Sequence, residues 1–309
     1  MLETKNLILV KIETGGYGVD AVPTPAADAV LVSNLSLAPA MEPNEHTGRS
    51  GSLSAFKLSK PTIGPFELKF SVELKGSGTA NVAPEYGPLL RIACMPESIL
   101  AGPNRVEYDL AHPGPSASIY AYPDGLLHKC LGSVSNAEIV LEAGKKGMIN
   151  FTVLCPFIIP TDVPIPSGAV YDTTVAPLIE NLNLSIGGYN PAFAKVSINL
   201  NNTISKRTSG NAPWGLLGME VTDRKVQGSI DPEAVTRATH DFWQLVQDAT
   251  AGAFSCVAGT TAGNRFTITG PQVQYSQLGY GARNQRRTYE LGLHFARNAG
   301  DDELKIKQD

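Results

Sequence analysis

Residues 66–75 read Phe-Glu-Leu-Lys-Phe-Ser-Val-Glu-Leu-Lys, and this stretch decides the fold. Apolar side chains occupy every even position and polar ones every odd position, which is the period of a strand with one buried face and one face in water. Gly76 and Gly78 follow, and Pro84 then suits the first position of a helix, where its missing N–H is no loss. The stretch predicts a strand, a glycine hinge and a short helix over residues 84–95, with leucine and isoleucine on its apolar side.

The same order of elements is predicted again further along the chain. Residues 216–227 form another expected strand, which ends at Gly228 as the first ends at Gly76. Asp231 suits a helix N-cap and Pro232 the first helical position, and apolar residues recur at spacings of three and four until Gly252. Hairpins are expected in corresponding places, at residues 137–154 and 272–295. Because 309 residues can hold two domains of about 150 residues each, we expect a duplication.

Prolines divide the predicted repeats. Pro156, Pro160, Pro164 and Pro166 leave residues 156–176 few backbone donors and little freedom, which favours a stiff linker. The expected organisation is an N-terminal arm (residues 1–34), a first domain (35–156), the linker (157–176), a second domain (177–298) and a charged C-terminal tail (299–309). We expect the tail to be mobile unless it adds to a neighbour.

Composition describes an ordinary soluble protein rich in strands and turns, with 30 Gly, 22 Pro, 42% hydrophobic and 17% charged residues. The formal charge is −4, and it divides into −3 for residues 1–156 (12 basic, 15 acidic) and −1 for residues 157–309 (13 basic, 14 acidic). Neither half therefore attracts nucleic acid by its overall charge. No run approaches 18 apolar residues, so no membrane span is expected.

Motifs for catalysis are missing from the sequence. Gly144-Lys145 lacks the glycine five residues earlier and the following Ser or Thr of a phosphate loop, and there is no Gly-x-Ser-x-Gly or His-Glu-x-x-His. The five histidines are isolated, which favours packing or surface roles. We expect no catalytic residue, no cofactor and no metal. The four cysteines are far apart in apolar surroundings and are predicted to be buried thiols in a reducing cytoplasm: Cys94, Cys130, Cys155 and Cys256.

Half-exposed sheets without an enzymatic site leave strand edges that need a partner, and the next subunit of a ring is one such partner. Three groups of residues form a recognisable pattern: Lys11-Ile12-Glu13-Thr14 with Tyr17-Gly18 and Pro23-Thr24, then Glu73-Leu74-Lys75-Gly76-Ser77-Gly78, and Pro84 with Leu89-Leu90-Arg91. Through these residues the sequence resembles the tail tube proteins of long-tailed bacteriophages, in particular the members of about this length with two tandem tube domains.

The resemblance implies a mainly β fold with flanking helices: two tandem tail-tube-like β-sandwich or half-barrel domains, each with one helix. It implies a structural protein of the virion tail, assembled in the host bacterial cytoplasm, whose stacked rings form a conduit for the ejection of double-stranded DNA. Two domains per chain favour a ring of three chains. The implied partners are further copies of the chain, other tail proteins such as the tape measure and the terminator, and DNA that passes without specific binding, with no membrane.

Two long polar segments, residues 42–54 and 201–213, exceed the usual length of a connection and are functional candidates. Within the resemblance they contact the next ring or subunit through Glu42, Asn44, Glu45, His46, Arg49, Ser52, Lys206, Arg207 and Ser209. The polar faces of the two repeated strands are candidates for the lumen, through Glu67, Lys69, Glu73 and Glu220, although the two hairpins compete for that place.

Other classes of protein remain open. A tail terminator or a capsid decoration protein would share such a fold without stacking on itself. A carbohydrate-binding module would need a shallow aromatic platform, and the sequence offers only Trp214 and Trp243 for one, beside a turn and on a predicted helix.

Overall fold

The structure is a computed structural model that describes residues 2, 4–45, 48–49, 51–54 and 56–309. The first part of the chain contains β1 (Asn6–Ile12), α1 (Pro25–Asp28), β2 (Ala29–Val30), β3 (Ser33–Asn44), β4 (Ser59–Glu73), α2 (Gly87–Arg91), β5 (Glu97–Leu100), β6 (Arg105–Asp109), β7 (Ala117–Pro123), β8 (Leu126–Glu142) and β9 (Met148–Pro156). The second part contains β10 (Thr161–Asp162), β11 (Ser185–Ile186), β12 (Phe193–Asn199), β13 (Asn202–Thr208), the 3-10 helix η1 (Pro213–Gly215), β14 (Leu216–Arg224), β15 (Gln227–Pro232), α3 (Phe242–Gln247), β16 (Gly252–Ala258), β17 (Phe266–Arg283), β18 (Arg286–Ala296) and β19 (Lys305–Gln308).

Eight strands form one antiparallel sheet, which we call the long sheet. Its order is β3–β4–β9–β8–β12–β15–β18–β17, so each half of the chain supplies four neighbouring strands. The halves meet where β8 pairs with β12, from Glu142 opposite Lys195 to Glu138 opposite Asn199. The mainly β fold is thus confirmed.

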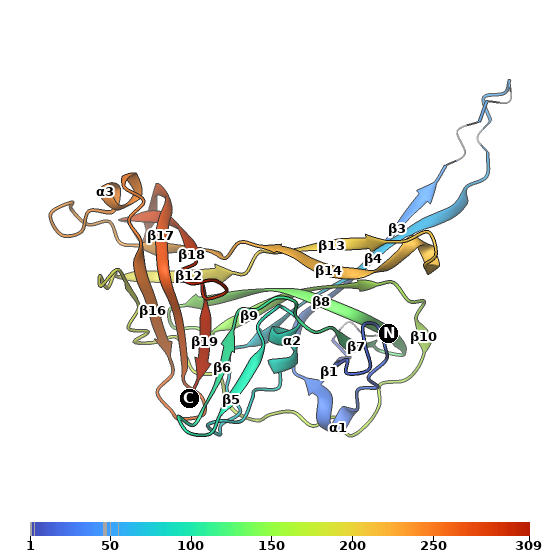
Figure 1. Cartoon of the computed structure of the whole chain (residues 1–309), viewed down its shortest axis with the longest axis horizontal. Helices are drawn as coiled ribbons and strands as arrows, with labels where there is room; N and C mark the ends of the chain where they lie inside the picture. Colours follow the sequence, from blue (N-terminus) through green and yellow to red (C-terminus); the bar gives the residue numbers. More distant parts are fainter. Residues whose placement is uncertain (1, 3, 46–47, 50, 55) are drawn as a thin grey trace.

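The core lies on one side of the long sheet. Phe66, Leu68, Phe70 and Val72 of β4 are at most 2% exposed, which confirms the predicted alternation. Smaller groups of strands cover the far side of this core: β1 with β2 and β7, and β6 with β5 and β19 (Figure 1). The strands β8 and β17 each run from this second layer into the long sheet.

Helices are shorter than the sequence predicts. The first expected helix has its helical turn at α2, with Leu89 and Leu90 buried. The expectation that a helix begins at Asp231 is wrong, because this residue lies in β15 and its carboxylate accepts the backbone N–H groups of Ala194 and Lys195. The helix α3 begins only after its N-cap Asp241.

Three segments expected to be irregular are structured. Much of the polar segment 201–213 is β13, which pairs with β14. The proline-rich segment pairs briefly with β8 through β10, and its apolar residues pack on the cluster that contains Leu7 and Tyr122. The expectation of a mobile C-terminal tail is wrong, because β19 lies between β6 and β17. The domain boundaries drawn from the sequence stay a prediction.

The order of strands repeats along the chain, and so does a detail of their register. We call β3–β4 the first hairpin (residues 33–73) and β12–β13–β14–β15 the second hairpin (residues 193–232). In the first hairpin, Pro39 pairs with Phe66 and Met41 with Ile63. In the second, Asn202 pairs with Arg224 and Ile204 with Val221. Both hairpins therefore carry one extra residue on the returning strand at the same place. With this shared irregularity as the reference point, Pro39 corresponds to Asn202 and Met41 to Ile204.

Candidate functional site

The polar face of the long sheet continues from one half of the chain into the other. Side-chain hydrogen bonds cross it between strands, and they are Ser71 Oγ to Asn150 Oδ1 (2.8 Å), Asn150 Nδ2 to Glu138 Oε2 (3.2 Å), Asn136 Nδ2 to Asn199 Oδ1 (2.8 Å) and the pair Ser197 Oγ and Ser229 Oγ (2.9 Å). Cross-strand pairs of this kind stabilise neighbouring strands. The polar face is therefore one surface with contributions from both halves.

Carboxylates outnumber lysines on this face. Positions that alternate with buried residues along the described strands carry the carboxylates Glu67, Glu73, Glu138, Glu142, Asp231 and Glu290 and the basic side chains Lys69, Lys195 and Arg283. Three ion pairs lie here: Glu67 with Lys69 (2.8 Å), Glu73 with Lys146 of the β8–β9 turn (2.6 Å) and Asp231 with Arg283 (2.7 Å). The face is thus acidic and partly neutralised.

The predicted lumen residues fall into two groups. Glu67, Lys69 and Glu73 lie on the polar face of the long sheet. Glu220 lies on β14, outside the long sheet, and pairs with Arg207 of β13 at 3.4 Å. The sequence matches Glu220 to the others because residues 216–227 are expected to form one strand like residues 66–75. In the structure the second hairpin bends between β14 and β15, at Asn201 and residues 225–226.

The predicted contact residues lie on the outer parts of the two hairpins. Glu42 and Asn44 are on β3, Glu45, Arg49 and Ser52 follow it, and all five are exposed, while His46 lies outside the described residues. Lys206 and Arg207 are on β13 and Ser209 follows it. The structure does not bring the two groups together. The outer end of the first hairpin projects beyond the rest of the molecule, whereas the ribbon β13–β14 runs across β8 and β9 (Figure 1).

Apolar contacts and hydrogen bonds hold the second hairpin on the first half. Met219 and Val221 share one buried cluster with Val134. The Tyr17 hydroxyl donates to the Gly132 carbonyl (2.9 Å) and accepts from the Met219 N–H (2.6 Å), which places its ring where a side chain at Gly218 would be. His112 Nε2 lies 2.8 Å from the Val221 carbonyl oxygen. The outer part of the second hairpin is thus seated within its own chain.

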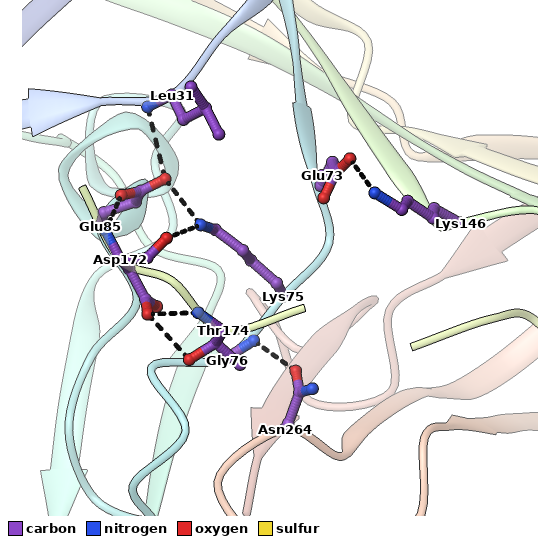
Figure 2. Close-up of polar contacts among 9 residues, drawn as sticks. All are labelled: Leu31, Glu73, Lys75, Gly76, Glu85, Lys146, Asp172, Thr174 and Asn264. Carbon is purple, nitrogen blue, oxygen red and sulfur yellow. Dashed lines mark hydrogen bonds and ion pairs between the residues drawn. The ribbon is translucent and has the colours of Figure 1, made fainter. Parts of the chain in front are cut away.

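A buried lysine connects the linker to the first half (Figure 2). Lys75 Nζ donates to the Asp172 carbonyl (2.7 Å) and lies 3.3 Å from Glu85 Oε1, with both side chains largely buried. The Glu85 carboxylate also accepts the N–H groups of Asp172 and Leu31. A buried charge that keeps its partner and its hydrogen bonds resists separation of the segments that carry it.

The next residue connects the two halves directly (Figure 2). The Gly76 N–H donates to Asn264 Oδ1 (2.8 Å), and Asn264 Nδ2 donates to the Val175 carbonyl (2.9 Å). A Cβ at Gly76 would overlap the Gly263 carbonyl oxygen. The expected hinge is therefore a point of close contact that fixes how the halves lie against each other.

Sequence reasoning missed the residues that lie at the two ends of the long sheet. Among the described residues, β3 pairs only with β4, and residues 274–283 of β17 pair only with β18. These two edges leave backbone N–H and C=O groups open to another strand. Leu35 and Leu37 alternate with polar residues and identify β3 as a strand, but no local signal names the edge that it would meet.

Metal and membrane features are few in the described part of the chain. No group of three or more His, Cys, Asp or Glu side chains is placed to hold a metal ion there. No described helix is long and apolar enough to cross a membrane. All four cysteines are buried and free, as predicted.

Comparison with known proteins gives one family. Residues 5–288 match the model of a family described as phage tail tube protein. A comparison with curated proteins finds no match. The matched range includes both hairpins, the contacts around Lys75 and Gly76 and the long sheet up to the first residues of β18, where the match ends.

Proposed function

The chain belongs to the phage tail tube protein family and is a structural protein of the virion tail, and we propose that three copies form each ring of a tube that conducts double-stranded DNA into the host. One observation carries this proposal. The junction between the halves is a strand pairing, β8 with β12. The strands that correspond to them, β17 and β3, are the open edges of the same sheet. Pairing β17 of one copy with β3 of the next repeats the junction and continues the sheet.

Three copies close such a sheet into a barrel whose diameter suits a DNA duplex. Eight strands per chain give 24 strands, and the spacing and tilt of strands in barrels then give roughly 45–50 Å between opposite backbones. Barrels of 16–18 strands already enclose a water channel. After side chains are added, a 24-stranded ring leaves room for a DNA duplex.

Charge supports passage rather than binding. In the proposed ring the polar face of the long sheet lines the lumen, where carboxylates outnumber lysine and arginine side chains and Arg283 is paired with Asp231. DNA binds proteins mainly through its phosphates and basic side chains. An acidic, partly neutralised wall repels the phosphates and gives them few cations to bind.

Stacked rings and other tail proteins complete the proposal. The segment between β3 and β4 projects from the molecule and carries the exposed side chains Leu53 and Leu58, which suits it to contact the next ring. The tape measure and the terminator are the expected partners inside and at the end of the tube. Assembly takes place in the host cytoplasm, where the buried thiols stay reduced.

A cysteine pair tests ring closure. Ser36 pairs with Lys69 in the first hairpin, and Asn199 pairs with Gln227 at the same place in the second hairpin, so Ser36 corresponds to Asn199. Gln277 of β17 pairs with Gly292 of β18, and Glu138 of β8 pairs with Asn150 of β9, so Gln277 corresponds to Glu138. Since Asn199 and Glu138 lie directly opposite each other, Ser36 of one copy is expected opposite Gln277 of the next.

Oxidation of Ser36→Cys with Gln277→Cys should therefore link assembled copies into closed trimers, read as mass on denaturing gels without reductant. The control pair Glu138→Cys with Asn199→Cys has the same geometry within one chain and should oxidise without changing the mass. Monomers from the first pair, when the control oxidises, would reject the proposed edge pairing. A ladder that extends to six chains would reject the trimer.

A further inference from the structure

The first hairpin differs from its counterpart in what covers it. Met41 corresponds to Ile204 by its place in the register, opposite Ile63 and Val221 respectively. Ile204 packs on the cluster of Val134 and Met219, whereas Met41 is 49% exposed. The second hairpin lies on β8 and β9. In the described chain the outer part of the first hairpin contacts the second hairpin at Lys60, whose Nζ lies 3.8 Å from the centre of the Trp214 ring, and its end projects beyond the rest of the molecule (Figure 1).

The surface of β8 and β9 on which the second hairpin lies, which we call its seat, is determined by the pairing of β12 with β8. Because β12 pairs with β8, a hairpin that continues from β12 passes over β8 and then β9. The side chain of Asn202, at the start of β13, binds the Ala93 and Ser135 carbonyls at 2.9 Å and 3.1 Å and fixes this direction. Val134 and Leu154, which are paired across β8 and β9, then receive the apolar side of the hairpin.

The same construction can be applied to the open edges. If β3 pairs with β17 of the next copy, the hairpin that continues from β3 passes over β17 and then β18 of that copy. Gln272 and Ala296 are paired there, at the positions that correspond to Val134 and Leu154. A positive φ follows each helix, 62° at Cys94 after α2 and 49° at Ala249 after α3, and the Ala249 carbonyl accepts from Gln274 Nε2, two residues after Gln272. The pair Gln272 and Ala296 is therefore the expected contact surface of the second half.

We propose that the first hairpin of each chain lies across β17 and β18 of the adjacent copy in the ring, with Met41 beside Gln272. The partner is a second copy of this chain, and the contact continues the edge pairing of β3 with β17. This inference rests on the proposed ring. Each ring then has six hairpins that lie on a neighbouring half, three within a chain and three between chains.

The two seats differ in polarity, because the one within the chain is apolar and the one offered to the adjacent copy is polar. Val134 is apolar and 7% exposed beneath the second hairpin. Its counterpart Gln272 is half-buried and donates through Nε2 to Asn298 Oδ1 at 3.0 Å. A polar seat stays compatible with water before assembly, so the separate chain exposes less apolar surface. The seat within the chain is covered from folding onward and needs no such compatibility.

A second cysteine pair tests the docking. We expect Met41→Cys with Gln272→Cys to give links between copies upon oxidation of the assembled full-length chain. The matched control is Ile204→Cys with Val134→Cys, which should oxidise within one chain. All of these variants carry Cys94→Ala, because the native thiol belongs to the same cluster as Val134 and could compete.

The outcomes separate the docking from the ring. Links from Met41→Cys with Gln272→Cys, at a yield comparable to the control pair, support the inference. Links from Ser36→Cys with Gln277→Cys and from the control, but none from Met41→Cys with Gln272→Cys, would show that the ring exists and that the hairpin lies elsewhere. If neither pair links copies while both control pairs oxidise, the proposed ring and the docking both fail.

Discussion

Gly76 and Lys75 show how two adjacent residues control the relation between the halves of the chain. Lys75 is buried against Glu85 and the carbonyl of Asp172, and so it holds the linker to the first half. Gly76 faces the other way, with its N–H bound to Asn264 of the second half. The glycine is required by the approach of the Gly263 carbonyl oxygen, which a Cβ would overlap. One strand end therefore fixes both the linker and the angle between the halves.

Replacing this glycine tests that role. Gly76→Ala should lower the free energy of unfolding by about 1–3 kcal/mol, because extra volume in a tight contact forces the backbone to shift. Denaturant unfolding measures the change. The matched control is Gly102→Ala, since a Cβ at Gly102 meets no atom within 4 Å, and its effect should stay within about 0.5 kcal/mol. Equal stability of the two variants would contradict the close contact.

At the scale of elements, β19 ties the end of the chain to its first half. The buried residues Leu304, Ile306 and Gln308 alternate with the half-buried Lys305 and Lys307, which is the pattern of a strand. Glu107 of β6 lies 3.2 Å from Lys305 and also pairs with Arg105. Burial acts to raise the pKa of Glu107, but the hydrogen bonds and charges of these two cations outweigh it and hold the pKa below its ordinary value.

This lowered pKa predicts a pH dependence. A carboxyl group whose pKa is lower in the folded state stabilises the fold above its unfolded-state pKa of about 4.3, and this contribution is lost as the pH falls through the folded-state value. Glu107→Gln should therefore be less stable than the wild type at about pH 7, and the difference should shrink in acid. Denaturant midpoints across this range measure it. The exposed-site variant Glu180→Gln should follow the wild type, and a constant gap for Glu107→Gln would contradict the role of this pair.

The elements also show how far sequence reasoning reaches. The alternation of residues 66–75 gave β4 correctly, because one buried face imposes a period of two on the sequence. The residues around Asp231 carry a genuine helix signal, but the signal is local. The Asp231 carboxylate accepts the N–H groups of Ala194 and Lys195, 37 and 36 residues away, and a contact so distant leaves no local signal. The segment 201–213 is expected to be a loop because Ile204 is its only large apolar residue. Much of it is a strand because it pairs with β14, and that pairing leaves no signal within the segment itself.

In the whole molecule, the two hairpins differ in the length of the segment that joins their outgoing and returning strands. The second hairpin turns back after residue 208 and returns at residue 216, whereas the first leaves β3 at residue 44 and returns at residue 59. The inner parts of both can therefore lie on neighbouring halves in one ring, while only the first has a segment left beyond that contact. A heterologous contact that does not close extends an assembly into a filament. The projecting segment is thus suited to join rings, and the edges of the long sheet to close them.

Removal of residues 44–52 tests this division of roles. The deletion leaves the core, both open edges and Met41 in place, so the chain should fold and still form rings. It removes the larger part of the projecting segment, and stacking into tubes should be lost. Negative-stain microscopy distinguishes tubes, single rings and monomers. Ser205→Ala is the control on the second hairpin: it removes an exposed hydroxyl that contacts Thr222, and tubes should persist. Tubes of normal length from the deletion would show that this segment does not join the rings, and monomers alone would place it in ring closure instead.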